Sequence, residues 1–439
     1  MSSKQAAAPD EACRYAMGID HNEAADVRAI AVAPSAELRT VTVRDFDGLA
    51  PHRAAWDRLA WSAPQQVANL LPSWVEAFLR HRLKPREKWF CSFAYRGDAL
   101  VGVLPAVVAP HPVLGRFRPL LSTPFDALTP SGDLLLDPAH AELALQALLA
   151  EARAAEPAHL GLALRAVRRS SPLWGALTAA GGDHVRHGLR ARFSFLDVSG
   201  DAETYFASLG NLRRNLKRYR KKLDGRGAVT VEMRRGVAPG DPFRDEFLAL
   251  EAAGWKGRND TALLNHPGAL AFYIALLDNI AATGRLEWQG IRLDGRLVAA
   301  GMGIRCGRSL MLPKIAFDED YTDCMPGNLL SAEVIRDGFA RSDVDEINHM
   351  SNAAWHQFWR MDSDDYTDIH LVRPGLVPIL FQLSRVGATA FYQDHIRPRI
   401  PAALKAAHRK FRRRGDRKPR RAAETRTADP LRTSAGNRS

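Results

Sequence analysis

Two strand hairpins of the same kind, one in each half of the chain, constrain the fold more than any other feature of the sequence. The first spans 89–104 and turns at Gly97, and the second spans 286–301 and turns at Gly295. In both halves, helices precede the hairpin and a strand–helix–strand pattern follows it. We therefore expect a tandem duplication of class α/β (α+β), in which each domain has a mixed, mostly antiparallel central sheet flanked by helices.

The length of the chain also calls for more than one domain. At 439 residues it is too long for one ordinary core, and its apolar fraction of 46% is that of a globular protein. We expect a disordered leader at 1–38, an N-terminal domain at 39–199, a C-terminal domain at 200–372, a helical extension at 373–396 and a basic disordered tail at 397–439.

The net charge of +12 belongs to the tail. Residues 397–439 contain 15 lysines and arginines and 3 acids, a net of +12, so residues 1–396 are neutral overall. Such a tail is most simply a solvated terminus, but it could also bind an anionic membrane surface or RNA, and 376–392 could form an amphipathic helix that supports docking on lipid. No apolar stretch approaches the ~20 residues of a transmembrane segment, and no signal-peptide pattern is present. We expect a cytoplasmic protein, peripheral at the inner face of the membrane if the tail binds lipid.

A strongly basic helix is predicted over 209–223. Its apolar residues recur at intervals of three and four, which gives one buried stripe, and seven lysines and arginines occupy the rest of the cylinder. Because these cations repel one another, a nearby anion would stabilise the helix, and Arg214 and Arg218 are candidate substrate-binding residues. The alternative is that the charged side is only a solvated face.

Short motifs between 254 and 330 indicate a ligand-binding cleft. Residues 254–257 (Gly-Trp-Lys-Gly) end a helix, and 310–317 has the pattern of a strand that contains Lys314, which lies either at an edge or in a cleft. Residues 326–329 (Pro-Gly-Asn-Leu) then open a helix, so free backbone amides and the helix dipole would face the phosphates of a nucleotide-like donor. Without a ligand, each motif would be an ordinary turn or helix cap.

Two histidines follow the next predicted strand, 344–348. His349 and His356 could titrate near neutral pH, and polar residues after a strand end are well placed for a cleft. An isolated histidine is more often a hydrogen-bonded structural residue, so this alternative applies to each of them. The chain lacks the glycine-rich nucleotide motifs, GxSxG and HExxH, and no histidine has metal-ligand partners at a suitable spacing, so we expect no metal.

Taken in order, these motifs resemble the CelD/BcsL-type acetyltransferases of the GCN5-related N-acetyltransferase (GNAT) superfamily, which is akin to the FemAB-like aminoacyl transferases. The resemblance rests on the basic helix, the motif at 254–257, the second hairpin, Lys-x-Ala-Phe-Asp-x-x-Tyr at 314–321 and Pro-Gly-x-Leu-Leu at 326–330. It implies tandem GNAT-like domains and, in the second, a sheet splayed at one point. Acetyl-CoA or another acyl-CoA would enter this splay with its pyrophosphate on the amides at 326–329.

The resemblance also implies direct transfer without a covalent enzyme intermediate. A backbone amide within 311–315 would polarise the thioester carbonyl while a neutral amine or a hydroxyl attacks it. The acceptor would be a small molecule or a glycan-linked group, in polysaccharide or cell-envelope biosynthesis. The implied catalytic residues are Lys314, Asp318, Tyr321 and His356, the cofactor-binding residues are Lys256, Pro326, Gly327, Asn328 and Leu329, and the substrate-binding residues are Arg214, Arg218, Trp255 and His349.

Two other functions fit the same sequence. A FemAB-like enzyme would take an aminoacyl group from charged tRNA, with the basic helix and the tail holding the RNA. A degenerate GNAT-like fold could instead serve as a non-catalytic scaffold in an exopolysaccharide assembly, docked to the membrane through its tail.

Overall fold

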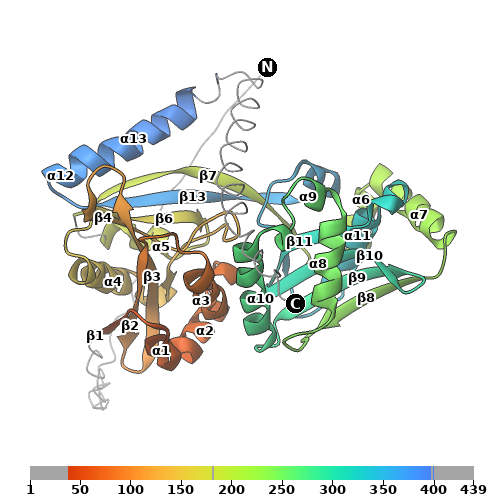
Figure 1. Cartoon of the computed structure of the whole chain (residues 1–439), viewed down its shortest axis with the longest axis horizontal. Helices are drawn as coiled ribbons and strands as arrows, with labels where there is room; N and C mark the ends of the chain where they lie inside the picture. The colour runs from red at the N-terminus through yellow and green to blue at the C-terminus, as the bar shows by residue number, and fades with distance from the viewer. Residues whose placement is uncertain (1–37, 180–181, 397–398, 400–439) are drawn as a thin grey trace, which may run out of the picture. The chain divides into compact units, whose positions relative to one another are not determined.

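The chain folds around one long sheet (Figure 1). The computed structural model describes residues 38–179, 182–396 and 399, so the predicted leader apart from Leu38 and the predicted tail apart from Arg399 lie outside the described residues. Within the described residues, thirteen strands form a single sheet in the order β1-β2-β3-β4-β6-β13-β7-β12-β11-β10-β9-β8, and β5 pairs with β3 beside this path.

The first half of the chain forms one end of this sheet. Strands β1 to β4 are antiparallel neighbours, and β6 then pairs in parallel with β4. The predicted hairpin is formed by β2 and β3, and β3 runs on to His111. The elements of this half are β1 (Leu38–Val43), α1 (Phe46–Leu49), α2 (Arg53–Ser62), α3 (Pro72–His81), β2 (Lys88–Arg96), β3 (Ala99–His111), β4 (Gly115–Ser122), β5 (Leu135–Leu136), α4 (Ala141–Ala155), β6 (Gly161–Arg168), α5 (Leu173–Ala176) and β7 (His184–Asp197).

The second half repeats this plan. Strands β8 to β11 are antiparallel neighbours and β12 pairs in parallel with β11, with a helix before the fifth strand in both halves. The predicted tandem, mostly antiparallel fold is therefore confirmed. The elements are α6 (Ala202–Ser208), α7 (Asn211–Asp224), β8 (Val229–Arg235), α8 (Phe243–Ala253), α9 (Trp255–Arg258), α10 (Pro267–Ala281), β9 (Leu286–Leu293), β10 (Arg296–Cys306), β11 (Ser309–Phe317), α11 (Pro326–Phe339), β12 (Glu346–Asn348), β13 (Asp362–Val372), α12 (Leu376–Pro378) and α13 (Ser384–Phe391).

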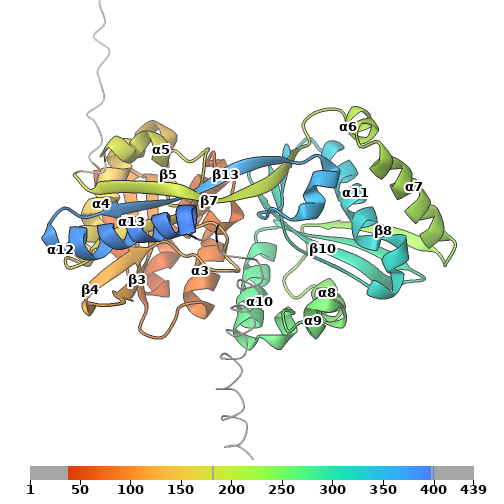
Figure 2. The ribbon, with the colours of Figure 1, turned by 90° about the horizontal axis from the view of Figure 1, so that it is seen from above.

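The two halves exchange their last strands. β7 ends the first half but pairs with β12 of the second, and β13 follows the second half but pairs with β6 of the first. β7 and β13 also pair with each other and run side by side in Figures 1 and 2. The predicted second domain, 200–372, therefore contains a strand that completes the sheet of the first half, and the domain limits themselves stay predictions.

Helices cover both faces of the sheet in the second half. Trp288 of β9 packs in a core shared with α8 and α10, whereas Ile291 of the same strand packs with α7 and α11. The first of these cores continues into the first half, where Trp74 of α3 meets Phe272 of α10 edge to face at 6.2 Å between ring centroids. One apolar core therefore joins the two halves beneath the sheet.

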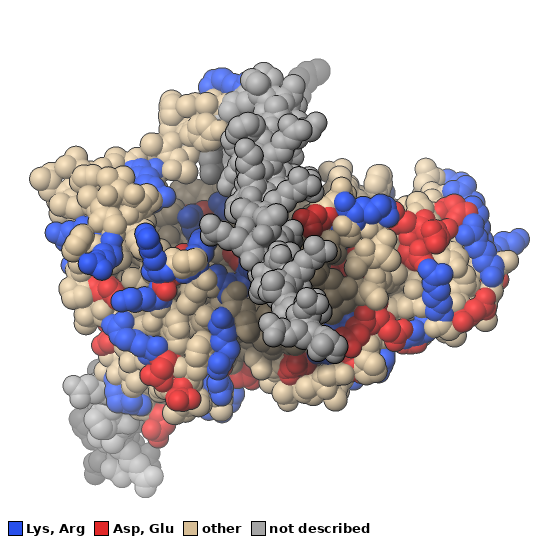
Figure 3. All heavy atoms as spheres, in the orientation of Figure 1, with Lys and Arg blue, Asp and Glu red and all other residues tan. Residues whose placement is uncertain are grey.

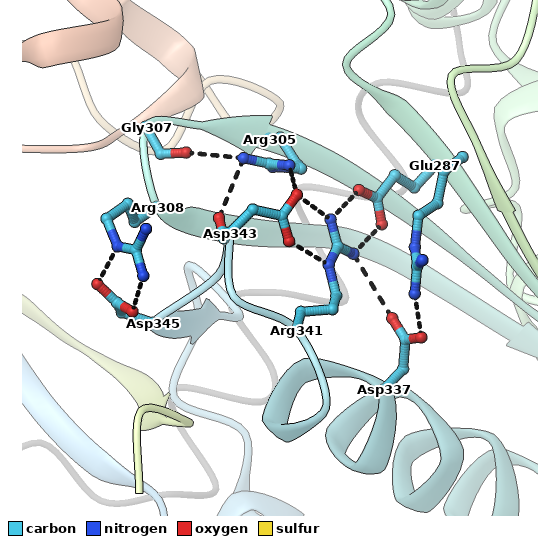
Figure 4. Close-up of polar contacts among 9 residues, drawn as sticks. Glu287, Arg305, Gly307, Arg308, Asp337, Arg341, Asp343 and Asp345 are labelled. Atoms are coloured by element: carbon cyan, nitrogen blue, oxygen red, sulfur yellow. Dashed lines mark hydrogen bonds and ion pairs between the residues drawn. The ribbon is translucent and has the colours of Figure 1, made fainter.

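Buried ion pairs fix the loop that leads from α11 into β12 (Figure 4). The Arg341 and Glu287 side chains are each 6% exposed, and the guanidinium donates to both oxygens of the carboxylate at 2.7 and 2.8 Å. The Nε atom of Arg341 donates to Asp343 at 2.8 Å, and Arg305 of β10 also pairs with Asp343. Asp337 of α11 lies 3.5 Å from Arg341. These contacts tie the start of β12 to β9, β10 and α11.

We predict that Arg341→Ala lowers the free energy of unfolding by about 3–5 kcal/mol, because Glu287 would keep a buried carboxylate without its partner. The matched control is Arg308→Ala, which removes an ion pair with Asp345 whose side chains are 50% and 43% exposed. This control should cost much less than Arg341→Ala, because the pair is exposed to solvent. Urea denaturation compares the two variants, and equal losses would contradict the structural role of Arg341.

Candidate active site

Strand β11 has an open edge. Its parallel pairing with β12 covers only Ser309 to Met311, and β12 ends at Asn348 while β11 continues to Phe317. On its other side β11 pairs with β10, and the register shifts opposite Pro313, which lies in a bulge where its missing N–H is tolerated. From residue 312 onward, no described strand pairs with the β12 side of β11, as expected for a splayed sheet.

The corresponding place in the first half is closed. The pairing of β4 with β6 ends at Ser122 and Ala163, but Gly132 then pairs with Arg165 of β6 through backbone hydrogen bonds of 2.7 and 2.9 Å. A Cβ atom on Gly132 would lie 2.4 Å from the carbonyl oxygen of Pro124, so only glycine allows this close approach. The open edge is therefore a feature of the second half.

Two hollows meet at the open edge of β11. The larger, with a volume of about 340 Å³ and here called the cleft, is lined by residues of both halves, including Leu128 from the first and Tyr273 from the second. The smaller, about 30 Å³ and here called the slot, lies against α11, which contributes Leu330 and Val334. The residues that line both hollows are Leu312, Lys314, Ile315, His349 and Trp355. A ligand along this edge would contact the cleft and the slot together.

A buried carboxylate holds two lysines at the cleft. Glu251 of α8 is fully buried and accepts hydrogen bonds from Nζ of Lys256 at 3.0 Å and Nζ of Lys314 at 3.1 Å. Burial alone would raise the pKa of Glu251, but Lys314 and Lys256 hold it below its ordinary value. Burial lowers the pKa of Lys314, and Lys256 adds to this effect while Glu251 opposes it. With both lysines protonated, one positive charge remains, which suits an anionic group in the cleft.

Lys256 also contacts the open edge itself. Its Nζ donates to the carbonyl oxygen of Ile315 at 2.9 Å. Because the N–H and C=O of one strand residue point to the same side, the Ile315 N–H also faces the open edge. This N–H can donate to the carbonyl oxygen of an acyl group, and it lies within the predicted range 311–315.

Three aromatic rings lie together beside the slot. The His349 ring is 4.7 Å from His356 and 5.3 Å from Trp355 between centroids. Burial lowers the pKa of His349 to about 3, with a contribution from His356, and burial lowers the pKa of His356 to about 4, so both rings are neutral at pH 7. His349 lines both hollows and can accept a hydrogen bond, although its low pKa makes it a weak base. In the described part of the chain, no His, Cys, Asp and Glu side chains gather as metal ligands would.

The structure separates the other predicted catalytic side chains from these hollows. His356 lines neither hollow, and both of its ring nitrogens are buried without a partner among the described residues. Asp318 pairs with Arg296 at 2.5 Å and caps the turn after β11. The Tyr321 ring lies 5.6 Å from the guanidinium of Arg226. These contacts give Asp318 and Tyr321 a structural role, and the catalytic roles of all three residues stay predictions.

The predicted substrate-binding arginines also lie outside the hollows. Arg214 and Arg218 are exposed on α7, where Figure 3 shows blue and red surface side by side. The side chain of Trp255 lies outside the described residues. Three cations of α7 have acidic partners, in the pairs Arg213–Glu203, Arg220–Asp224 and Lys222–Asp323. Part of the basic face is therefore neutralised by the protein, and binding by Arg214 and Arg218 stays a prediction.

The corner before α11 differs from the expected set of free amides. Pro326 has no N–H, and the N–H groups of Asn328 and Leu329 both donate to the carbonyl oxygen of Met325, at 3.0 and 3.1 Å. Met325 adopts a left-handed conformation with φ of 49°, which brings this carbonyl to the helix start. Only the N–H of Gly327 remains in the predicted segment, so the corner offers a phosphate fewer amides than we expected.

The loop that enters this corner is acidic as well. Asp323 pairs with Lys222 and Arg226, each at 2.5 Å, and the hydrogen bond from Lys222 holds its pKa below the ordinary value. Glu319 pairs with Arg258. Lys222 and Arg226 share the single carboxylate of Asp323, so one positive charge remains beside this corner. Binding of the CoA diphosphate at 326–329 therefore stays a prediction.

Glu251 and Tyr273 are residues of the site that sequence reasoning missed. Glu251 follows Phe247 by four positions, so it falls on the buried side of α8, and a lone acid on an apolar stripe is a signal of a buried ion pair. Lys314 Nζ lies 5.2 Å from the centroid of the Tyr273 ring. No local pattern marks Tyr273, because it reaches the cleft only through the packing of α10.

Comparisons with known proteins agree with this geometry. Residues 210–354 match the family model of an acetyltransferase (GNAT) domain, so this part of the chain carries a GNAT-type acetyltransferase domain. Among solved structures, the chain is similar to FemX, with a TM-score of 0.54 and 12% identity over 78% of this chain and 99% of that one. Among curated proteins, no match was found.

Two further structures are similar at lower TM-scores. They are a tandem GNAT protein from the clavulanic acid biosynthesis pathway (TM-score 0.40, 14% identity, 77% of this chain and 100% of that one) and L-PGS from Bacillus licheniformis (0.43, 11%, 74% and 97%). Their TM-scores are too low to carry an argument, and the likeness to FemX shows the fold alone because the identity is low. The GNAT-type domain is thus confirmed, and the CelD/BcsL-type resemblance stays a prediction.

We predict that stability falls as the pH drops from 6.5 towards 4, because buried neutral His356 does not take up the proton that the unfolded chain binds. One such histidine contributes a slope of up to about 1.4 kcal/mol per pH unit in this window. His356→Phe should reduce the slope relative to the wild type. Urea unfolding across the window measures both, and an unchanged slope in His356→Phe would refute the assignment.

Proposed function

We propose that the chain is an acyltransferase that moves an acyl group, first of all acetyl from acetyl-CoA, to an amine or hydroxyl acceptor. The observation that carries this proposal is the open edge of β11, where the cleft and the slot share five residues. The GNAT-type domain at 210–354 includes this edge and supports the same conclusion.

Each group at the edge has a distinct role in the proposed transfer. The Ile315 N–H donates to the acyl carbonyl oxygen, on which negative charge develops as the acceptor attacks. His349 accepts a hydrogen bond from the acceptor and orients its lone pair. As the new bond to the acyl carbon forms, the C–S bond of the thioester breaks, and the proton that the acceptor loses ends on the departing thiolate. Because burial lowers the pKa of His349 to about 3, the acceptor amine must arrive neutral or lose its proton to water.

The cleft supports an acceptor that carries an anionic group. Lys256 and Lys314 share the single carboxylate of Glu251, so the cluster keeps one positive charge at the wall of the cleft. A carboxylate or phosphate on the acceptor would be attracted there and would hold its amine near the edge. An acidic glycan-linked acceptor, as in polysaccharide or cell-envelope biosynthesis, is consistent with this charge.

We predict that Ile315→Pro lowers kcat for acyl transfer by about 10²–10³-fold, because it removes the N–H that would stabilise the developing oxyanion. Proline is tolerated where the N–H faces an open edge, so the fold should persist, and Ile315→Val keeps the N–H and serves as the matched control. Thiol release from acetyl-CoA with a panel of acidic amines measures the rate, and circular dichroism checks the fold. A folded Ile315→Pro protein with the rate of Ile315→Val would overturn the role of the edge.

A FemAB-like aminoacyl transferase is the second candidate. The observation that favours it is the corner at 325–329, where the amides of Asn328 and Leu329 are used internally and fewer remain for a diphosphate than expected. An aminoacyl donor on tRNA needs no diphosphate site there, and the exposed cations of α7 would face the RNA.

The two donors are distinguished by binding. If acetyl-CoA is the donor, it should raise the melting temperature of the full-length protein, and the aminoacyl-tRNA should not. If aminoacyl-tRNA is the donor, it should bind with an affinity that falls steeply with salt, and Arg214→Glu with Arg218→Glu should weaken it about tenfold or more. Arg86→Glu with Arg169→Glu, which makes the same change of charge at two exposed residues of the first half, away from α7, is the control. Absence of both effects would remove both candidates and favour a non-catalytic scaffold.

A further inference from the structure

The helix after β13 turns its apolar side outward. The chain is helical from Leu376 to Ile396, and Leu376, Leu380 and Phe391, which lie on one side at helical spacing, are 73%, 57% and 58% exposed. Gln382, on a different side, is buried, and its Oε1 atom has no partner among the described residues. A helix packed only for its own stability would bury the apolar side instead.

The tip of the β3–β4 hairpin extends this apolar surface. Val113 and Phe117 are 74% and 75% exposed there. His111 of β3 meets Phe381 of the helix at 6.3 Å between ring centroids, so the hairpin and the helix are in contact. Figures 1 and 2 both show β4 next to α12. The exposed side chains of the helix and the hairpin tip together form what we call the docking surface: Val113, Phe117, Leu376, Ile379, Leu380 and Phe391.

Positive charge borders the docking surface. Arg116 and Arg118, on either side of Phe117, are exposed and form no ion pair among the described residues. The segment 397–439 follows the helix directly and has a net charge of +12, whereas 1–396 is neutral. In Figure 3 the upper left of the molecule, where Figure 1 places α12 and α13, is mostly tan with a few blue side chains.

We propose that the docking surface binds the anionic phospholipid surface of a membrane. Exposed leucine and phenylalanine side chains can enter the boundary between headgroups and acyl chains, while the bordering arginines and the tail are attracted to anionic lipid. None of the described helices has the length and apolar character to cross a bilayer, so the attachment is peripheral. A second copy of the chain is a poorer occupant, because two tails of +12 would repel each other. RNA would match the charge but leave the apolar side chains exposed.

The test is co-sedimentation of the full-length protein with vesicles of phosphatidylcholine and phosphatidylglycerol, and with vesicles of phosphatidylcholine alone. We expect binding to the anionic vesicles and an about tenfold or larger loss of bound protein in Leu380→Asp. Leu143→Asp is the matched control, because Leu143 on α4 is also 57% exposed but lies outside the docking surface, and it should bind like the wild type. Replacing Arg412, Arg413 and Arg414 with glutamine in the full chain should weaken binding and reduce its dependence on salt.

Five outcomes would overturn the proposal. The first is that the protein does not bind the anionic vesicles, and the second is that Leu380→Asp and Leu143→Asp bind equally well. The third is that sedimentation without lipid shows a dimer that Leu380→Asp dissociates, which would make a second copy of the chain the occupant. The fourth is that the protein binds an RNA oligonucleotide but not vesicles. The fifth is that Leu380→Asp raises hydrogen exchange only within residues 1–37, which would make that segment the occupant. The readout is lipid binding, so it does not depend on the proposed acyl transfer.

Discussion

The short parallel pairing between β11 and β12 is the constraint on which the candidate active site depends. Because this pairing ends at Met311, the rest of β11 keeps a free edge, and groups from separate parts of the chain gather around it. Of the two lysines bound to Glu251, Lys256 comes from α9 and Lys314 from β11 itself, and His349 follows the end of β12. The buried pair of Arg341 and Glu287 holds the loop that enters β12, and so determines where the two strands separate.

Local patterns predicted most of the sheet. The hairpin at 286–301, the strand at 310–317 and the helix that begins at Pro326 all lie close to their observed bounds, because alternation, turn glycines and helix starts are local signals. The exchange of β7 and β13 was not predicted. The pattern of a strand indicates which side is buried but not which neighbour it will have, and both exchanged strands find partners far away in the sequence.

The candidate site was predictable where side chains follow directly from a strand or helix end. Lys256, Lys314 and His349 line the cleft, since each lies beside the open edge. Asp318 and Tyr321 were selected for their chemistry, but in the structure each contacts an arginine. Such contacts between residues distant in the sequence cannot be recognised from a single sequence. The hydrogen bonding of the backbone amides at 326–329 could not be predicted from the sequence either. A proline followed by a glycine indicates a helix start, but the conformation of the residue before the helix determines whether the first backbone amides stay free.

The exchanged strands also set the order in which the chain can be completed during synthesis. Arg165 of β6 pairs with Asp368 of β13 at 2.8 Å, although the two residues are 203 positions apart. Almost the whole second half must therefore leave the ribosome before β13 can cover the edge of β6. Until then the nascent first half exposes an unpaired strand edge, which is a template for aggregation. Expression of either half alone would leave such a strand edge permanently unpaired.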